Sequence, residues 1–398
     1  MTLSFELSDE LRGYGRQLRD WSVREARPLA READDRHALP ADWSKVLDSC
    51  PVPVGRTDIP DAEPIPAFPD GEKVTMLVYY ENVNYGDPWV MTAIGGGIGH
   101  LPVRKIGTPE QIATWYTPVV KSGLMTGFAL PEPQCGSDTS QIATTAIRDG
   151  GSWVLNGNKI FCSNGAQAEY ITVFATTDKA AGARGIAVFI VPRDTPGLII
   201  VKANESKLGV RSTLTSELRF ENCVIPLENR LGWDAAGPAA DAPSLGGQAG
   251  ALSSLADNRP NVAAWAIGTA QAALDVARER LLAQRHGFTP RRWTVIEAEL
   301  DRMDAALGRG RLLNLKAQYL VDHGTPSRAA AAIAKGFSPQ TCERIVLRCM
   351  QLLGPEGTSR KLLLEKWYRD IKILDIFEGT AQIQRLVIAR QLLGRAAG

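Results

Sequence analysis

The most restrictive feature of this chain is that its apolar residues change their spacing twice along 398 residues. Residues 125–233 contain short apolar runs that are typical of strands, whereas residues 255–398 repeat apolar positions at helical spacing. Residues 1–124 begin with a region dense in Arg, Glu and Ala, and Thr108-Pro109-Glu110 indicates a helix start. The sequence therefore predicts an α+β chain with an N-terminal helical domain, a middle β-domain and a C-terminal helical domain.

The middle domain is expected to be an antiparallel β-domain inserted between the helical regions. Asn156-Gly157 lies between the apolar runs 153–155 and 160–161, and this dipeptide predicts the turn of a β-hairpin. Further strands are predicted at residues 171–175, 185–191 and 198–201.

The segment 234–254 consists mostly of Ala, Gly, Pro and Ser, which predicts a flexible linker or insertion. Helical spacing resumes at Arg259 and continues to Leu393, so residues 255–398 are expected to form a bundle of helices.

The composition argues against several classes of function. The formal net charge is +1, which disfavours nucleic acid or an anionic membrane surface as the main partner. Six cysteines without a Cys-x-x-Cys pair predict reduced thiols in a cytoplasmic protein, and four dispersed histidines predict no metal site. We find no apolar run of membrane-spanning length and no signal-peptide pattern.

One carboxylate near the C-terminus has the surroundings of a general base. Glu378 follows Ile376-Phe377 and precedes Gly379-Thr380, where a helix is expected to begin with Thr380 as its N-cap. The helix dipole favours the anion, whereas apolar neighbours raise the pKa of a carboxyl group. A carboxylate balanced in this way suits the removal of a weakly acidic proton. A surface Glu at a helix start is the alternative.

Three further segments favour the first interpretation. Residues 128–138 read FALPEPQCGSD, residues 153–165 read WVLNGNKIFCSNG, and residues 207–212 read KLGVRS. In this order, and followed by Gln351-Leu352-Leu353-Gly354 and the Glu378 segment, they resemble the acyl-CoA dehydrogenase family of flavoproteins. The resemblance extends from about Leu101 to the C-terminus. It implies FAD as cofactor and a C-terminal four-helix bundle.

The resemblance also implies the reaction, which is the α,β-dehydrogenation of an acyl thioester such as an acyl-CoA. Glu378 matches the base that takes the α-proton while flavin N5 takes the β-hydride, and its backbone N–H would bind the thioester oxygen. Gly379 would allow the substrate to approach closely. Some branches carry the base at the position of Asn258, which cannot act as one. Arg259 matches a residue near the CoA moiety, and a structural ion pair is its alternative.

The flavin contacts that the resemblance implies lie in two domains. Those of the middle domain are Phe128, Ala129 and Leu130 beside the ring, Gly136 and Ser137 at the phosphates or the pantetheine, and Phe161 and Ser163 at the opposite ring edge. Those of the C-terminal domain match contacts to a neighbouring subunit's flavin and are Arg285, Phe288, Gln351, Gly354, Thr380 and Gln382. Contacts across subunits imply a homo-oligomer, a tetramer or a dimer. An ordinary turn residue for Ser137 and a plain core residue for Phe161 remain alternatives.

Some positions depart from the family pattern. Pro131 stands where the family commonly has a Thr that donates a hydrogen bond to the flavin, and Pro355 replaces a Gly. The glycine-rich segment 95–100 has two open interpretations, a flexible joint between helices or a widened acyl pocket. The Arg369-Asp370 pair is interpreted as a structural salt bridge.

Three functions follow from these residues. The leading one is an acyl-CoA dehydrogenase that passes electrons to an electron-transfer flavoprotein. The second is a flavin monooxygenase or oxidase of the same architecture, and the third is a non-catalytic partner subunit of a hetero-oligomer. Glu378 argues against the second and the third, whereas Pro131 weakly favours the third.

Overall fold

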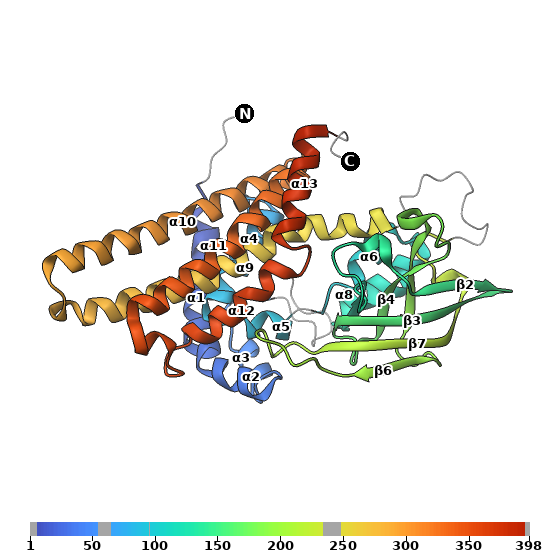
Figure 1. Cartoon of the computed structure of the whole chain (residues 1–398), viewed down its shortest axis with the longest axis horizontal. Helices are drawn as coiled ribbons and strands as arrows, with labels where there is room; N and C mark the ends of the chain where they lie inside the picture. Colours follow the sequence, from blue (N-terminus) through green and yellow to red (C-terminus); the bar gives the residue numbers. More distant parts are fainter. Residues whose placement is uncertain (1–5, 55–64, 95, 234–247, 395–398) are drawn as a thin grey trace.

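The computed structural model describes residues 6–54, 65–94, 96–233 and 248–394, with the backbone alone for 248–257. Its β-sheet lies at one end of an elongated molecule and the long helices of the C-terminal domain reach the other end (Figure 1). Three regions in the predicted order, helical, β and helical, confirm the expected fold class.

The N-terminal region is helical, as predicted. Its helices are α1 (Asp9–Trp21), α2 (Ala30–Arg36), α3 (Trp43–Asp48), α4 (Glu72–Gly86), α5 (Trp89–Ile94), α6 (His100–Ile106), α7 (Pro109–Gln111) and α8 (Thr117–Ser122). The predicted helix start at Thr108 is confirmed by a capping box, in which Thr108 and Gln111 each bond the other's backbone N–H. Buried aromatic side chains, including Trp21 and Trp89, fill the core of this region.

Two glycines between α5 and α6, Gly97 and Gly99, serve close packing. Gly97 has a φ of +82°, and a Cβ added there would overlap the carbonyl oxygen of Thr126. A Cβ on Gly99 would overlap the carbonyl oxygen of Gly127 in the same way. Missing side chains at these two positions therefore let the N-terminal region approach the first strand. They do not open an acyl pocket, so that interpretation is wrong for Gly97 and Gly99.

The middle region forms one sheet of seven strands. They are β1 (Thr126–Ala129), β2 (Thr145–Asp149), β3 (Ser152–Ser163), β4 (Tyr170–Thr176), β5 (Ile186–Pro192), β6 (Leu198–Lys202) and β7 (Thr215–Pro226). The order is β1-β4-β2-β3-β7-β6, and β5 pairs with β4. Most pairs are antiparallel as expected, but β1 and β2 each run parallel to β4. The sheet is therefore mixed, because long connections separate these strands in the sequence.

The predicted hairpin at Asn156-Gly157 is wrong. Both residues lie inside the continuous strand β3, where the pairing with β7 shifts register between Leu155 and Gly157. The dipeptide forms a bulge because Gly157 has a φ of +149° and lies against Thr144. The turn that joins β2 to β3 falls instead at Gly150-Gly151.

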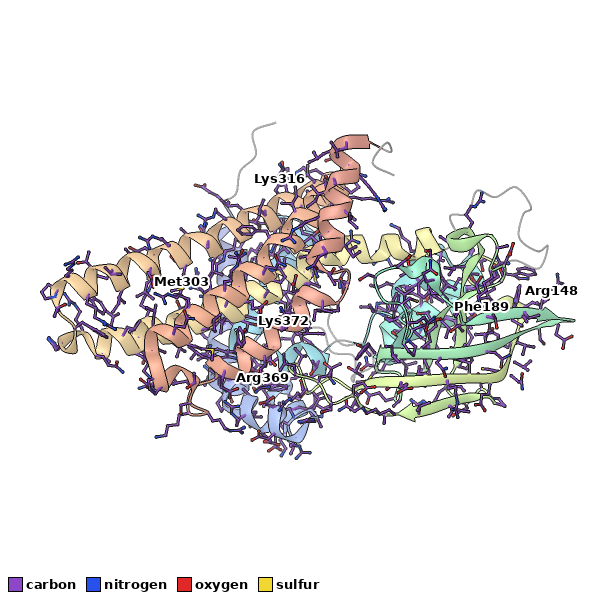
Figure 2. All side chains as sticks on the ribbon, in the orientation of Figure 1. Arg148, Phe189, Met303, Lys316, Arg369 and Lys372 are labelled. Atoms are coloured by element: carbon purple, nitrogen blue, oxygen red, sulfur yellow. The ribbon has the colours of Figure 1, made fainter. Side chains whose placement is uncertain are left out.

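The C-terminal region is built from five helices, α9 (Gln248–Ala283), α10 (Pro290–Asp322), α11 (Arg328–Leu353), α12 (Leu364–Ile376) and α13 (Ala381–Leu393). Residues 248–254, predicted as part of a linker, belong to α9, because their alanines and leucine favour a helix. The rest of that linker, 234–247, lies outside the described residues. Figure 2 shows side chains filling the bundle, where the buried Met303 lies, and the sheet, where the buried Phe189 lies.

Candidate active site

Glu378 lies in the short connection between α12 and α13. Its backbone is left-handed, with a φ of +56°, and Gly379 follows with a φ of +91°. Such a conformation costs a non-glycine residue roughly 1–3 kcal/mol and persists only where the surroundings impose it. Thr380 is the N-cap of α13, because its hydroxyl accepts a hydrogen bond from the Ile383 N–H at 3.3 Å, as predicted.

Two buried side chains hold this strained connection in place. Lys335 on α11 donates from Nζ to the carbonyl oxygens of Asp375 (3.0 Å) and Gly379 (2.6 Å). Gln384 on α13 donates from Nε2 to the Gly379 oxygen as well, at 2.9 Å. The carbonyl groups on both sides of Glu378 are therefore fixed by helices outside the connection.

The two oxygens of the Glu378 carboxyl group differ in their surroundings. Oε1 accepts a hydrogen bond from Asn258 Nδ2 at 2.6 Å. Oε2 is buried and has no hydrogen-bond partner among the described residues. Burial raises the pKa of Glu378 to about 7, against the opposing effects of the Asn258 hydrogen bond and the charges of Lys335 and Arg259. This environment differs from that of an open surface Glu.

Other charged and polar groups face the carboxyl group from three helices. Arg259 on α9 has a buried Nε without a partner in the described part of the chain, and burial lowers its pKa against the charge of Glu378. Burial lowers the pKa of Lys335 to about 8. Burial and the Glu378 charge together raise the pKa of Tyr80, on α4, to about 12.

The sequence did not predict the observed roles of four of these neighbours, which are Tyr80, Asn258, Lys335 and Gln384. The position of Asn258 drew attention only because an Asn cannot act as a base, whereas its amide serves as a donor to the base. The sequence does contain a feature from which a buried Lys335 could be predicted, because this single charged residue follows the apolar run Ala329–Ala334. A lysine in such a run is rarely buried unless it has partners.

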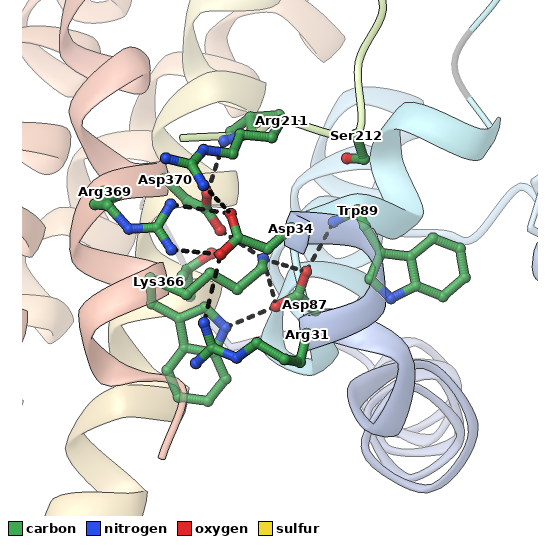
Figure 3. A network of polar contacts seen from close by, with 12 residues as sticks. Arg31, Asp34, Asp87, Trp89, Arg211, Ser212, Lys366, Arg369 and Asp370 are labelled. Atoms are coloured by element: carbon green, nitrogen blue, oxygen red, sulfur yellow. Dashed lines mark hydrogen bonds and ion pairs between the residues drawn. The ribbon is translucent and has the colours of Figure 1, made fainter. Parts of the chain in front are cut away.

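The helix that leads to Glu378 is anchored by buried charges (Figure 3). Lys366 on α12 contacts Asp87 and Asp370, each at 2.7 Å, and Trp367 donates to Asp87 at 2.9 Å. Arg369 pairs with Asp34 of α2. Arg369 and Asp370 are thus structural, as predicted, but each forms its ion pair with another residue.

The segment 207–212 packs against the same helix. Asp370 accepts a hydrogen bond from the Val210 N–H at 2.6 Å, and a Cβ on Gly209 would overlap the Arg369 carbonyl oxygen. This segment of the middle region therefore fixes α12 rather than contributing a reactive group.

In the middle region, the predicted flavin residues lie around β1 and β3. Phe128 and Ala129 are buried in β1, and Leu130 follows them. Phe161 is 58% exposed and left-handed at the second bulge of β3, so its interpretation as a core residue is wrong. Ser163 ends the same strand.

The loop after β1 is open at its tip and fixed at its base. Ser137 is exposed, and a Cβ added to Gly136 would meet no atom within 4 Å. Where the loop joins the sheet, the buried Lys159 donates to Glu132 at 2.7 Å and to the Leu130 carbonyl at 3.0 Å. An exposed aromatic side chain, a nearby hydroxyl group and an open glycine turn suit a flat ring with a polar edge and phosphate groups.

The predicted contacts of the C-terminal region are divided between two places. The connection from α9 to α10, with Arg285 and Phe288, lies at the end of the molecule opposite the sheet (Figure 1). There the Arg285 guanidinium lies 4.5 Å from the centre of the Trp293 ring. Gln351 accepts a hydrogen bond from Arg348 at 3.1 Å, and Gly354 is the C-cap of α11. Thr380 and Gln382 lie instead at the start of α13. Within one chain, the group around Arg285 is not brought together with Phe161 and Ser163.

Comparison with known proteins agrees with this architecture. The acyl-CoA dehydrogenase C-terminal domain matches residues 246–393 and the middle domain matches residues 127–223. The mitochondrial short-chain specific acyl-CoA dehydrogenase of Rattus norvegicus is 34% identical, over 98% of this chain and 92% of that protein. The cyclohex-1-ene-1-carbonyl-CoA dehydrogenase of Geobacter metallireducens is 32% identical, over 94% and 96%. Butyryl-CoA dehydrogenase from Megasphaera elsdenii superposes with a TM-score of 0.82 at 28% identity, over 98% and 100%.

The chain belongs to the acyl-CoA dehydrogenase family. It is an FAD-dependent oxidoreductase that acts on a CH–CH bond and dehydrogenates an acyl-CoA between its α and β carbons. The predictions of family, activity and cofactor are confirmed, and the relatives favour a dehydrogenase over the oxidase and partner-subunit alternatives. Among the helices of the described ranges, none has the length and apolar character needed to cross a bilayer.

Proposed function

We propose that Glu378 is the base that removes the α-proton of a short-chain acyl-CoA. The observation that carries this proposal is the buried Oε2, which has no partner among the described residues, in a carboxyl group whose pKa is raised to about 7. Near neutral pH such a group is partly ionised, and its proton affinity is far higher than that of an exposed carboxylate. When bound, FAD supplies the acceptor for the β-hydride.

The left-handed connection gives the base its position. Lys335 and Gln384 hold the carbonyl groups around Glu378, so its side chain is directed by the protein rather than by the substrate. A Cβ on Gly379 would come within 2.7 Å of Gln384 Nε2, so the missing side chain lets Gln384 pack against the connection. The Gly379 backbone is also proposed to lie beside the thioester. The Glu378 N–H is proposed to donate to the thioester oxygen, where negative charge develops as the α-proton leaves. Arg259 and Ser137 are proposed to contact the CoA part of the substrate.

The acyl group is proposed to be short. Trp265 packs edge-on against Phe377 with ring centres 6.2 Å apart, directly beside the base, and Tyr80 lies near the carboxyl group. These bulky side chains limit the space around the α-carbon. The relatives include a short-chain specific enzyme and one named for a cyclic acyl-CoA, which supports a compact acyl group.

The flavin site is proposed to be completed by a second copy of the chain. Phe128, Ala129, Leu130, Gly136, Ser137, Phe161 and Ser163 would hold one side of FAD. A neighbouring subunit would contribute Arg285, Phe288, Gln351, Gly354, Thr380 and Gln382. At the start of α10, an open groove of about 390 Å³ is lined by three arginines, three apolar residues, Thr289 and Glu299, and its Val295 is 58% exposed. A homotetramer or a dimer would cover these apolar groups and the exposed Leu392 and Leu393 of α13.

The electron acceptor is proposed to be an electron-transfer flavoprotein, and the location the cytoplasm. The location is supported by six free cysteines, of which five are buried, because such thiols are typical of a reducing compartment. Anaerobic addition of butyryl-CoA to the purified holoenzyme tests the reaction. The flavin absorbance band should bleach, and a longer acyl chain should bleach it more slowly. A band that persists with every acyl-CoA would contradict the proposal.

A further inference from the structure

A series of three side-chain amides leads from the interior of the bundle to Glu378. Gln318 on α10 donates from Nε2 to Asn261 Oδ1 at 3.2 Å. Asn261 on α9 donates from Nδ2 to Asn258 Oδ1 at 3.0 Å, and Asn258 donates to Glu378 Oε1 at 2.6 Å. Gln318 is fully buried and Asn261 is 8% exposed, so water competes little for the hydrogen bond between them, whereas Asn258 is half-buried.

The carboxylate determines the direction of the whole series. An ionised carboxylate can only accept, so Asn258 must present its NH₂ group to Glu378 and its oxygen to Asn261. Asn261 then has only its own oxygen left for the NH₂ group of Gln318. Asn258 and Asn261 are three residues apart on one helix face, which allows this contact. The donor that reaches Glu378 is therefore oriented by two amides behind it.

This arrangement makes the two carboxyl oxygens unequal. A donor at 2.6 Å occupies Oε1 and forms a hydrogen bond to a charged acceptor, which is stronger than a neutral one. Oε2 has no such contact with the rest of the described chain. We propose, on the basis of the proposed role of Glu378, that Asn258 is a positioning residue that holds Oε1 and leaves Oε2 as the atom that receives the α-proton.

The hydrogen bond from Asn258 also affects the acidity of the base. The groups that face Glu378 are Asn258 and Arg259 from α9, Lys335 from α11 and Tyr80 from α4. Asp375, at the end of α12, interacts with Lys335. The Asn258 hydrogen bond stabilises the ionised carboxylate, so its removal should make Glu378 harder to ionise. The carboxyl group would also become free to turn, and the reactive oxygen would no longer be defined.

The test is the titration of Glu378 in the holoenzyme without substrate. Infrared difference spectra between pH values show the carboxyl band, and the Glu378→Gln variant identifies it by its loss. In Asn258→Leu, which keeps the volume but removes the donor, the titration midpoint should rise by roughly one pH unit. At pH 6, kcat for butyryl-CoA should fall by about tenfold, while KM changes little.

Two further variants separate positioning from a structural role. Asn261→Leu leaves Asn258 in place but removes its support, so it should raise the midpoint less, and it replaces Asn258→Leu if that variant does not fold. Asn229→Ala is the control, because this buried amide donates to the Ile190 carbonyl in the sheet at 2.8 Å, and it should leave the midpoint unchanged.

The outcomes distinguish this inference from the proposed function. An unchanged midpoint in both Asn258→Leu and Asn261→Leu overturns the positioning role, even if Glu378→Gln is inactive. Full activity of Glu378→Gln overturns the role of Glu378 itself.

Discussion

The two ends of α12 show buried charge used in two ways. In its first turns, Lys366 contacts both Asp87 and Asp370, and the second oxygen of Asp370 accepts from the Val210 N–H. After its last turn, Glu378 Oε2, Arg259 Nε and Gln384 Oε1 are buried without partners in the described chain. A buried polar group with every bond made stabilises one conformation, whereas a buried group left unpaired is available for a ligand or a proton. Asp375 Oδ1, near the end of the helix, is also buried without a hydrogen-bond partner in the described chain, so Glu378, which follows the helix, is distinguished by its unpaired oxygen together with the raised pKa of its carboxyl group.

The two ends of α12 also differ in the pKa of the buried lysine beside each of them. Burial opposes the charge of Lys366, but Asp370 and Asp87 outweigh it and raise its pKa. Lys335, beside the base, has carbonyl partners instead of carboxylates in contact, and burial lowers its pKa to about 8. Two buried lysines therefore differ because of the charge of their partners. The first is fixed in its charged form, and the second titrates close to neutral pH.

The largest expected effect is a loss of turnover at the end of α12 that leads to Glu378. Glu378→Gln keeps the shape of the side chain but removes the carboxylate, so turnover should fall by about 100-fold to 10,000-fold. The free energy of unfolding should not decrease, because no ion pair is broken. The measurement is the anaerobic rate of flavin bleaching by butyryl-CoA, with acyl-CoA binding as the control. Bleaching at the wild-type rate would mean that the base lies elsewhere.

Substitution in the first turns of α12 should instead reduce the stability of the fold. Lys366→Met leaves Asp87 and Asp370 buried without their cation, so the free energy of unfolding should fall by about 3–5 kcal/mol. The matched control is Lys372→Met on the same helix, whose ion pair with Glu343 at 3.1 Å is largely solvated, with the lysine side chain 43% exposed. This variant should lose about 0–1 kcal/mol. Urea unfolding of both variants decides it, and equal losses would contradict the contrast.

Lys335→Met tests the support of the strained connection. It removes the only donor described for the Asp375 carbonyl and one of two for the Gly379 carbonyl, so stability should fall by about 1–3 kcal/mol. The turnover number should also fall, because Glu378 can leave its left-handed conformation. Gln384→Met, which keeps both Lys335 contacts, is the control and should have smaller effects. A destabilised Lys335→Met enzyme with full turnover would show that the strain is unimportant for catalysis.

The sequence predicted the parts of this site that depend on neighbours along the chain. The N-cap at Thr380 is a local feature and is confirmed, whereas of the predicted apolar frame Phe377 packs against the core and Ile376 is 48% exposed. The hydrogen bond from Asn258 was not predictable, because its acceptor is 120 positions away. The failed hairpin has the same cause, since Asn156 and Gly157 are held in a bulge by Asn222 and Thr144. These tertiary contacts outweigh the preference of an Asn-Gly dipeptide for a tight turn.

The last expected effect is a difference in pH dependence between the two ends of α12. The pKa of Glu378 is raised in the folded state, so its contribution to stability is present below about 4.5 and is lost as the pH rises through about 7. Asp34, which pairs with Arg369, behaves in the opposite way. Burial opposes its ionisation, but Arg369 lowers its pKa, so its contribution is lost as the pH falls through and below its ordinary value of 3.8.

Urea unfolding between pH 5 and pH 7.5 isolates the effect of Glu378. The wild type should lose stability relative to Glu378→Gln by at most about 1.4 kcal/mol per pH unit, because a single proton is involved. Parallel curves for the two proteins would mean that Glu378 keeps its ordinary acidity, and its environment would then resemble the charged end of the helix.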